Sequence, residues 1–282
     1  MNAFRFQVSR PGLWFQTVWL YLLPTAGRED LLGSWRFWLG LAFVSYPLNL
    51  LVYGWNDVVD REIDLLNPRK GSWIFGARGS REQLERLPRF IAAVFVPSAV
   101  LLAIVEPRLA ILLAAMVAVN AAYNAPRRGL RSRPPFELLN QLGYLLILPF
   151  SSWLNEVEPV RWAAVGYLVL FCTHAHLIGE IMDVEPDRAS GRSTTATVLG
   201  VRATKAVVLA LVVVEGCVLA VVFDELVLGA FLLFGALWLL ADLVLLDPTR
   251  RYSRGEYRLL GIALNLSGFA SIGWIWLRGG LR

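Results

Sequence analysis

Three observations predict an all-α protein that crosses a membrane many times. Hydrophobic residues make up 56% of the 282 residues and charged residues only 17%, whereas soluble domains carry about 25% charged residues. The mean hydropathy is positive, at +0.54. The apolar residues also gather into about nine long runs. Because a transmembrane helix satisfies its backbone hydrogen bonds internally, such runs favour a polytopic helical membrane bundle.

Each apolar run is interpreted as one transmembrane helix. Several runs are shorter than the roughly 20 residues that an upright helix needs, so we expect tilted helices or longer boundaries. The first run lacks a small-residue cleavage site, which favours a helix that is retained over a cleaved signal. Residues 1–282 are expected to form a single transmembrane domain. The expected spans are Leu13 to Ala26, Trp38 to Trp55, Phe90 to Val105, Leu109 to Tyr123, Leu138 to Leu154, Trp162 to Met182, Ala206 to Phe223, Leu226 to Leu246 and Leu259 to Leu277.

The distribution of Lys and Arg tests this arrangement, because positive residues are favoured in cytoplasmic loops. If the spans alternate in direction, 21 of the 27 Lys and Arg residues fall on one side, which places the N-terminus in the cytoplasm. The net charge of +5 is explained by attraction of these residues to anionic lipid, so no nucleic-acid partner is needed. The six on the other side are Arg28, Arg36, Arg108, Arg161, Arg278 and Arg282.

Two acidic clusters stand at the ends of apolar runs, both on the predicted cytoplasmic side. Carboxylates are costly near a bilayer, so their presence indicates function. Spacings of three and four residues put their oxygens on one helix face. The clusters are Asn56-Asp57-x-x-Asp60-x-x-x-Asp64 and Glu180-x-x-Asp183-x-x-x-Asp187.

Oxygen-rich clusters of this kind suit Mg²⁺. This ion typically binds through one or two carboxylates together with substrate phosphates. Ions held between two facing helix ends would neutralise a diphosphate and stabilise the charge that develops on it as the carbon–oxygen bond breaks. The apolar interior would hold the hydrocarbon part. The sequence therefore favours Mg²⁺ as cofactor and a phosphorylated, lipid-like substrate.

The two motifs resemble those of the UbiA superfamily of intramembrane prenyltransferases. Residues 56–68, NDVVDREIDLLNP, are similar to its N-D-x-x-D-x-x-x-D signature, and residues 183–196, DVEPDRASGRSTTA, resemble its second acidic element. Arg10-Pro11 and Tyr123 also match. The resemblance implies nine helices around a central cavity, where Mg²⁺ bridges both motifs and the diphosphate of a prenyl donor. The allylic cation would then react with a lipophilic acceptor, which is aromatic, a quinone precursor or a carotenoid or other isoprenoid.

The resemblance also implies a role for each matching residue. Asp60, Asp183 and Tyr123 are the expected catalytic residues, and the Tyr123 ring either stabilises the cation or anchors the helix at the interface. The expected metal ligands are Asn56, Asp57, Asp60, Asp64, Glu180, Asp183 and Asp187, with Asp57 turned either to the metal or to a cation. The expected substrate-binding residues are Arg10, Arg61, Lys70, Arg131 and Arg192, of which several are equally explained as membrane anchors.

Four polar residues within the apolar runs have less definite roles. His176 stands four residues before Glu180, so we expect a hydrogen bond within that helix, with proton removal as the alternative. His174 cannot share a helix face with His176 as a metal pair. Glu215 and Asp242 either face the cavity or mark errors in the span boundaries.

Two other functional classes also use acidic residues in membrane proteins. A secondary transporter would place them near the bilayer midplane beside broken helices. A membrane phosphotransferase would use aspartates crowded into one motif, whereas about 119 residues separate Asp64 from Asp183. The positions of the clusters therefore favour a prenyltransferase.

Overall fold

The computed structural model describes residues 2–67, 70–125, 129–245, 254–279 and 281. Within these residues the chain is helical and contains no strand, only one isolated antiparallel bridge between Ser72 and Gly76. The prediction of an all-α fold is confirmed. The α-helices are α1 (Asn2–Val8), α2 (Trp14–Leu22), α3 (Trp35–Ser45), α4 (Pro47–Val59), α5 (Arg61–Leu66), α6 (Arg81–Val105), α7 (Leu109–Asn124), α8 (Leu139–Leu142), α9 (Ile147–Asn155), α10 (Trp162–Ala189), α11 (Thr195–Leu199), α12 (Val201–Val222), α13 (Leu226–Val244) and α14 (Arg254–Arg278).

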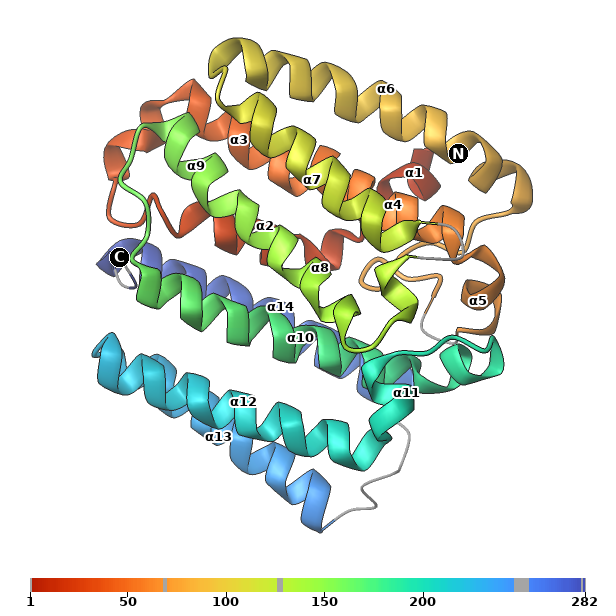
Figure 1. Cartoon of the computed structure of the whole chain (residues 1–282). Coiled ribbons are helices and arrows are strands. Elements are labelled where there is room, and N and C mark those ends of the chain that lie inside the picture. The colour runs from red at the N-terminus through yellow and green to blue at the C-terminus, as the bar shows by residue number, and fades with distance from the viewer. Residues whose placement is uncertain (1, 68–69, 126–128, 246–253, 280, 282) are drawn as a thin grey trace.

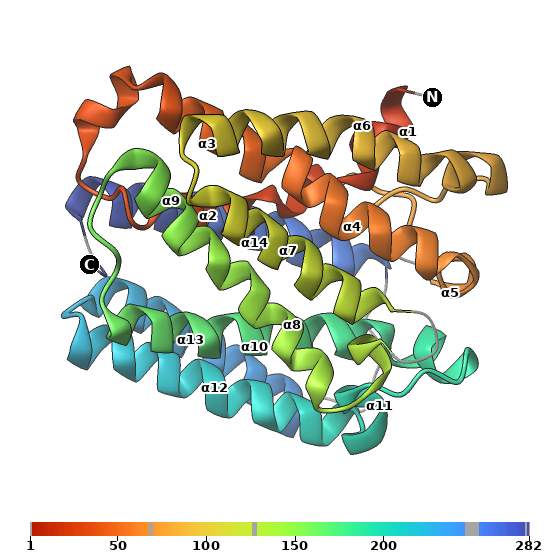
Figure 2. The ribbon, with the colours of Figure 1, turned by 45° about the horizontal axis from the view of Figure 1, so that its top comes forward.

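The long helices lie alongside one another and form a bundle (Figure 1). Helix α6 occupies one edge, while α12 and α13 form the opposite edge and α12 also packs against α10 (Figure 2). The short helices α5 and α11 lie at the same end of the bundle as α1, and α14 finishes at the opposite end. This end with α5 and α11 is where both acidic clusters come together.

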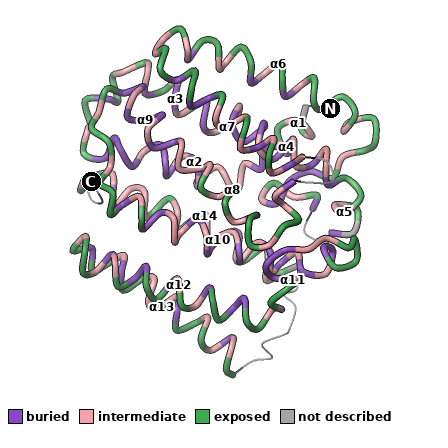
Figure 3. Tube along the Cα trace, viewed as in Figure 1, coloured by how far each residue is buried: buried purple, intermediate pink, exposed green. Residues whose placement is uncertain are grey.

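The surface of the bundle is suited to lipid. Six helical stretches in the described residues are long and apolar enough to cross a membrane. Large apolar side chains on the outer helices are exposed, such as Ile104 at 73% and Phe234 at 71%, and exposed residues mark the outward faces of these helices in Figure 3. Helix α7 is apolar but shorter. The count of nine spans and the assignment of the chain to a single domain stay predictions.

The helix boundaries differ from the apolar runs for identifiable reasons. The run Trp38 to Trp55 is broken at Pro47, which begins α4 because proline lacks a backbone N–H. Helix α6 starts nine residues before Phe90, since Ser80 and Gln83 form a capping box ahead of a charged turn. Helix α10 continues seven residues beyond Met182 and carries the second cluster on its last three turns. The run Leu138 to Leu154 contains α8, a 3₁₀ turn and α9.

Some predicted positions lie outside the described residues. They are Leu246, at the end of the eighth predicted span, Pro68 and Arg69 after the first cluster, the loop residues Pro126, Arg127, Arg128, Arg250 and Arg251, and Arg282.

The core near α2, α3 and α9 is closely packed around one glycine. Tyr21 is fully buried and donates a hydrogen bond from its hydroxyl to the Phe37 carbonyl at 2.8 Å. A Cβ at Gly40 would lie 2.5 Å from Leu154 Cδ2 and 2.7 Å from Tyr21 Cε2. Only glycine therefore permits this approach of α3 to its neighbours.

Two buried polar contacts link the C-terminal helices. Lys205 of α12 lies 2.5 Å from the carboxylate of Asp242 on α13, and both side chains are at most 3% exposed. His174 of α10 contacts Glu215 of α12, with 2.6 Å between Nδ1 and Oε1. Glu215 and Asp242 therefore form contacts between helices. Neither of them lines the cavity that contains the two acidic clusters.

Candidate functional site

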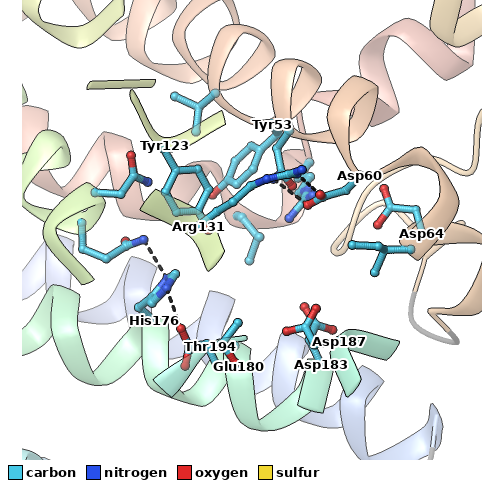
Figure 4. Close-up of a pocket in the computed structure, with 18 of the residues that line it drawn as sticks. Tyr53, Asp60, Asp64, Tyr123, Arg131, His176, Glu180, Asp183, Asp187 and Thr194 are labelled. Carbon is cyan, nitrogen blue, oxygen red and sulfur yellow. Dashed lines mark hydrogen bonds and ion pairs between the residues drawn. The ribbon is translucent and has the colours of Figure 1, made fainter. Parts of the chain in front are cut away.

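A cavity of about 210 Å³ lies at the end of the bundle that carries α5 and α11. Figure 4 shows Asp60 and Asp64 on one wall, and Asp183 and Asp187 on the facing wall formed by α10. Asn56 and Glu180 also line this cavity. The fold thus brings two clusters that are far apart in the sequence to a single site.

Asp57 and Asp64 are held by cations. Asp57 Oδ1 accepts hydrogen bonds from Arg10 Nη2 at 2.9 Å and from Lys70 Nζ at 2.5 Å. Lys70 Nζ also lies 2.7 Å from Asp64 Oδ2. Burial raises the pKa of the Asp64 carboxyl to about 6, although the Lys70 ammonium opposes this shift. Asp57 is buried beneath the lining, so it holds Arg10 and Lys70 in place while Asp64 faces the cavity.

Asp60 is the meeting point of two arginines from different segments. Its Oδ1 is paired with Arg131 Nη1, and its Oδ2 accepts from Arg192 Nη1 at 3.0 Å and from Asn56 Nδ2 at 2.9 Å (Figure 4). Arg192 Nη1 also lies 3.7 Å from Asp187 Oδ1. Burial alone would lower the pKa of Arg192, but Asp60 and the neighbouring acids outweigh it and raise this pKa, so the guanidinium remains charged.

The second cluster is oriented by partners outside it. Asn67 Nδ2 donates to Asp183 Oδ1 at 2.8 Å, which connects the tail of the first cluster to α10. Glu180 Oε2 accepts from the backbone N–H of Ala196 at 2.9 Å, and its other oxygen lies 3.1 Å from His176 Nε2. The remaining nitrogen of His176 is 2.8 Å from Gln141 Nε2. His176 and Glu180 therefore lie side by side on α10 as their spacing predicts, but the predicted hydrogen bond between them is not formed.

The other predicted site residues divide into two groups. Tyr123 and Arg10 line the cavity, and the Arg10 guanidinium lies over the ring of Tyr53 at 4.5 Å. Arg61 is half exposed, forms an ion pair with Glu62 at 3.0 Å, and is absent from the cavity lining. His174 faces α12 and not the cavity.

Sequence reasoning missed several polar and aromatic residues at this site. Asn67 lies three residues after Asp64, within the stretch 56–68 that resembles the first family motif, and this position was its only signal. Tyr53 stands three residues before Asn56, one turn away on the same helix, so helical spacing could have identified it. Gln141 lies in α8 and Tyr144 in the 3₁₀ turn before α9, and the sequence contains no comparable signal for either.

The chemistry of the lining fits Mg²⁺. Its charged donors are carboxylate oxygens, with the amide of Asn56 beside them. Among the described residues, no three His, Cys, Asp or Glu side chains are placed to hold a metal by themselves. Because Mg²⁺ commonly completes its coordination with water and substrate phosphates, a sparse carboxylate set facing an open cavity is suitable. In this structure Arg131 and Arg192 form ion pairs with Asp60, and Lys70 forms one with Asp64.

The sequence of this chain is similar to those of known proteins. The model of the UbiA prenyltransferase family matches residues 13–263. A lycopene elongase/hydratase of Corynebacterium glutamicum is 32% identical over 201 residues, covering 69% of this chain and 68% of the relative. That of Haloarcula japonica is 31% identical over 203 residues, covering 69% and 66%.

Solved structures share the fold. A UbiA homologue from Archaeoglobus fulgidus, bound to DMAPP and Mg²⁺, superposes with a TM-score of 0.66 at 15% identity, covering 96% of this chain and 99% of the other. The apo structure of a homologue from Aeropyrum pernix gives a TM-score of 0.59 at 20% identity, covering 95% and 96%.

Proposed function

The chain belongs to the UbiA prenyltransferase family and is a multi-pass membrane prenyltransferase, and we propose that it moves a prenyl group from an isoprenoid diphosphate to a lipophilic acceptor with the help of Mg²⁺. One observation carries this proposal: Asp60 and Asp64 face Asp183 and Asp187 across a single cavity. A shared cavity allows both carboxylate pairs to act on the same diphosphate.

The acidic residues of the cavity would hold Mg²⁺. When bound, Mg²⁺ would neutralise the diphosphate and stabilise the charge that develops on it. Asn56, Asp60, Asp64, Asp183 and Asp187 face the space where it would bind. Glu180, also a predicted ligand, lines the same cavity, whereas Asp57, the other predicted ligand, is buried beneath the lining.

Basic and aromatic residues complete the proposed donor site. Arg131, Arg192, Lys70 and Arg10 line the cavity and supply N–H donors for phosphate oxygens, a role in which arginine is favoured by its fork of donors. Tyr123 presents an aromatic side chain to the same space, where its ring would shield the allylic cation from water.

For the acceptor we propose a carotenoid or a related long polyene. Curated relatives at 31% and 32% identity are named lycopene elongase/hydratases. In the proposed reaction the carbon–oxygen bond of the donor breaks, diphosphate leaves, and a donor carbon bonds to an alkene carbon of the acceptor. The acceptor cation then loses a proton or takes up water. A small apolar recess that includes Leu48, Met116 and Ile147 adjoins the cavity and would give the hydrocarbon of a substrate an apolar contact surface.

We also propose that this cavity opens toward the cytoplasm. The support is the distribution of charge, since 21 of the 27 Lys and Arg residues fall on the side of the two acidic clusters. Soluble prenyl diphosphates would then reach the site without crossing the membrane.

The test is incubation of membranes containing the protein with labelled prenyl diphosphates of several chain lengths. Each prenyl diphosphate is supplied together with a polyene, an aromatic acid or a quinone precursor as acceptor. The products are identified by mass spectrometry. A prenylated polyene is the expected product. Exclusive prenylation of an aromatic ring would overturn the acceptor, and no transfer with any pair would overturn the proposed reaction.

Two variants test the metal site in the same assay. Asp60→Ala and Asp183→Ala should abolish turnover while the protein remains folded, because each removes a carboxylate from a different wall of the cavity. Full activity of both variants in the presence of Mg²⁺ would show that the metal site is misassigned.

A further inference from the structure

Glu137 is a buried carboxylate next to the proposed active site but outside its lining. It belongs to a 3₁₀ turn, Phe136–Leu138, and its side chain is fully buried. Oε1 accepts hydrogen bonds from the backbone N–H of Thr195 at 2.6 Å and from its hydroxyl at 2.5 Å. Burying a carboxylate costs free energy unless it is well paired, so the buried position of Glu137 indicates that this residue has a specific role.

The two segments joined by Glu137 each carry one of the arginines at Asp60. Arg131 lies in the 3₁₀ turn Leu130–Ser132, six residues before Glu137, and this turn packs against that of Glu137. Arg192 lies three residues before Thr195. A second link runs between the same segments, because Arg192 Nε donates to the Arg131 carbonyl at 3.3 Å.

Thr195 is also fixed from the opposite side. It begins α11, and the adjacent Ala196 donates its N–H to Glu180 of α10 at 2.9 Å. Thr194 caps the same helix through a reciprocal capping box with Thr197. The segment that carries Arg192 is therefore held to α10 by Glu180 and to the Arg131 segment by Glu137.

We propose that Glu137 is a positioning residue for diphosphate binding, which fixes Arg131 and Arg192 as one unit by tying their two segments together through Thr195. Both guanidinium groups contact Asp60. The distance between them suits a single anion as long as the two segments keep their relative position. The inference rests on the proposed function, because it assigns the arginines to the diphosphate. Glu137 itself does not touch the substrate.

The test measures binding of inorganic pyrophosphate in the presence of Mg²⁺ by calorimetry on the full-length protein in detergent, together with KM and kcat for the prenyl donor. Glu137→Ala and Thr195→Val should each weaken pyrophosphate binding about tenfold, as is usual when a residue that orients a ligating group is lost. KM for the donor should rise in parallel. Thr195→Ser keeps both donors to Glu137 and should bind like the wild type.

A double-mutant cycle distinguishes positioning from simple stability. If Glu137 acts through Arg131 and Arg192, the loss of pyrophosphate affinity in Glu137→Ala/Arg131→Ala should be smaller than the sum of the losses in the two single variants. Additive losses would overturn the inference. Thr195→Val provides the same cycle with Arg131→Ala if Glu137→Ala does not fold.

Glu215→Ala is the matched control, since Glu215 is another fully buried carboxylate but pairs with His174 away from the cavity. It should lower Tm without changing the affinity for pyrophosphate. An equal loss of affinity in this control would also overturn the inference. Failure of the wild type to bind pyrophosphate with Mg²⁺ would instead reject the proposed function.

Discussion

Asn67 donates a hydrogen bond to Asp183 at 2.8 Å and so connects the two acidic clusters directly. The carbonyl of Asn67 in turn accepts from Arg78 at 2.8 Å, which fixes the segment after α5. One oxygen of Asp183 is therefore oriented by the tail of the other motif. The two walls of the cavity are coupled without any metal between them.

Asn67→Ala should raise the Mg²⁺ concentration needed for half-maximal prenyl transfer by about tenfold, because Asp183 loses the donor that orients it. The measurement is a Mg²⁺ titration of activity at saturating donor. Asn155→Ala is the control, since Asn155 is also buried but bonds to Ser151 and Tyr21 in the core. An unchanged Mg²⁺ requirement in Asn67→Ala would show that this contact has no part in the metal site.

Removal of divalent cations with EDTA should stop prenyl transfer and leave the bundle folded. Lys70, Arg131 and Arg192 already neutralise the carboxylates of the first cluster, so the metal is not needed to prevent repulsion among them. We expect Tm in detergent to change by less than about 3 °C, equivalent to about 1 kcal/mol. Loss of the folded state in EDTA would contradict this, as would undiminished activity.

Asp242→Ala should destabilise the protein by about 3–5 kcal/mol, because it leaves the Lys205 ammonium in a buried position without the carboxylate it contacts. The double variant Lys205→Met/Asp242→Leu should recover most of this loss, since it removes both charges and keeps apolar volume. Thermal unfolding in detergent measures both. If the double variant were no more stable than Asp242→Ala, the loss of stability would not be caused by breaking the pair of Lys205 and Asp242.

Gly40→Ala should lower stability by about 1–3 kcal/mol, because its Cβ would collide with Leu154 and Tyr21. Gly235→Ala on α13 is the matched control, since a Cβ there meets nothing within 4 Å. Thermal unfolding of the two variants should therefore differ clearly. Equal Tm values would mean that the core adapts to the extra methyl group.

Much of the fold was predictable because hydropathy is a local property. The apolar runs located the long helices, and the run Leu109 to Tyr123 differs from α7 by one residue. Errors arose where polar residues continue a helix, as at Arg81 in α6, or where proline interrupts an apolar run, as at Pro47. Helix caps and charged turns extend helices without contributing to mean hydropathy.

The site was predictable only as far as its motifs. The family resemblance of the two motifs predicted that Asp60 and Asp183 share a cavity, and both residues line it. The resemblance could not indicate that Arg131 and Arg192 both pair with Asp60, because those contacts join segments 71 and 132 residues away from it. The role of Glu137 depends on Thr195 in the same way. Such partners follow from tertiary packing and have no sequence period.

Helices α1 and α14 place the start and the finish of the chain at opposite ends of the bundle (Figure 1). In the proposed orientation, reporter domains fused to the two termini would be separated by the lipid bilayer. A fluorescent protein on one terminus and an impermeant-label tag on the other would read different compartments in intact cells. A purification handle can likewise be placed on the terminus remote from α5 and α11, leaving the mouth of the cavity unobstructed.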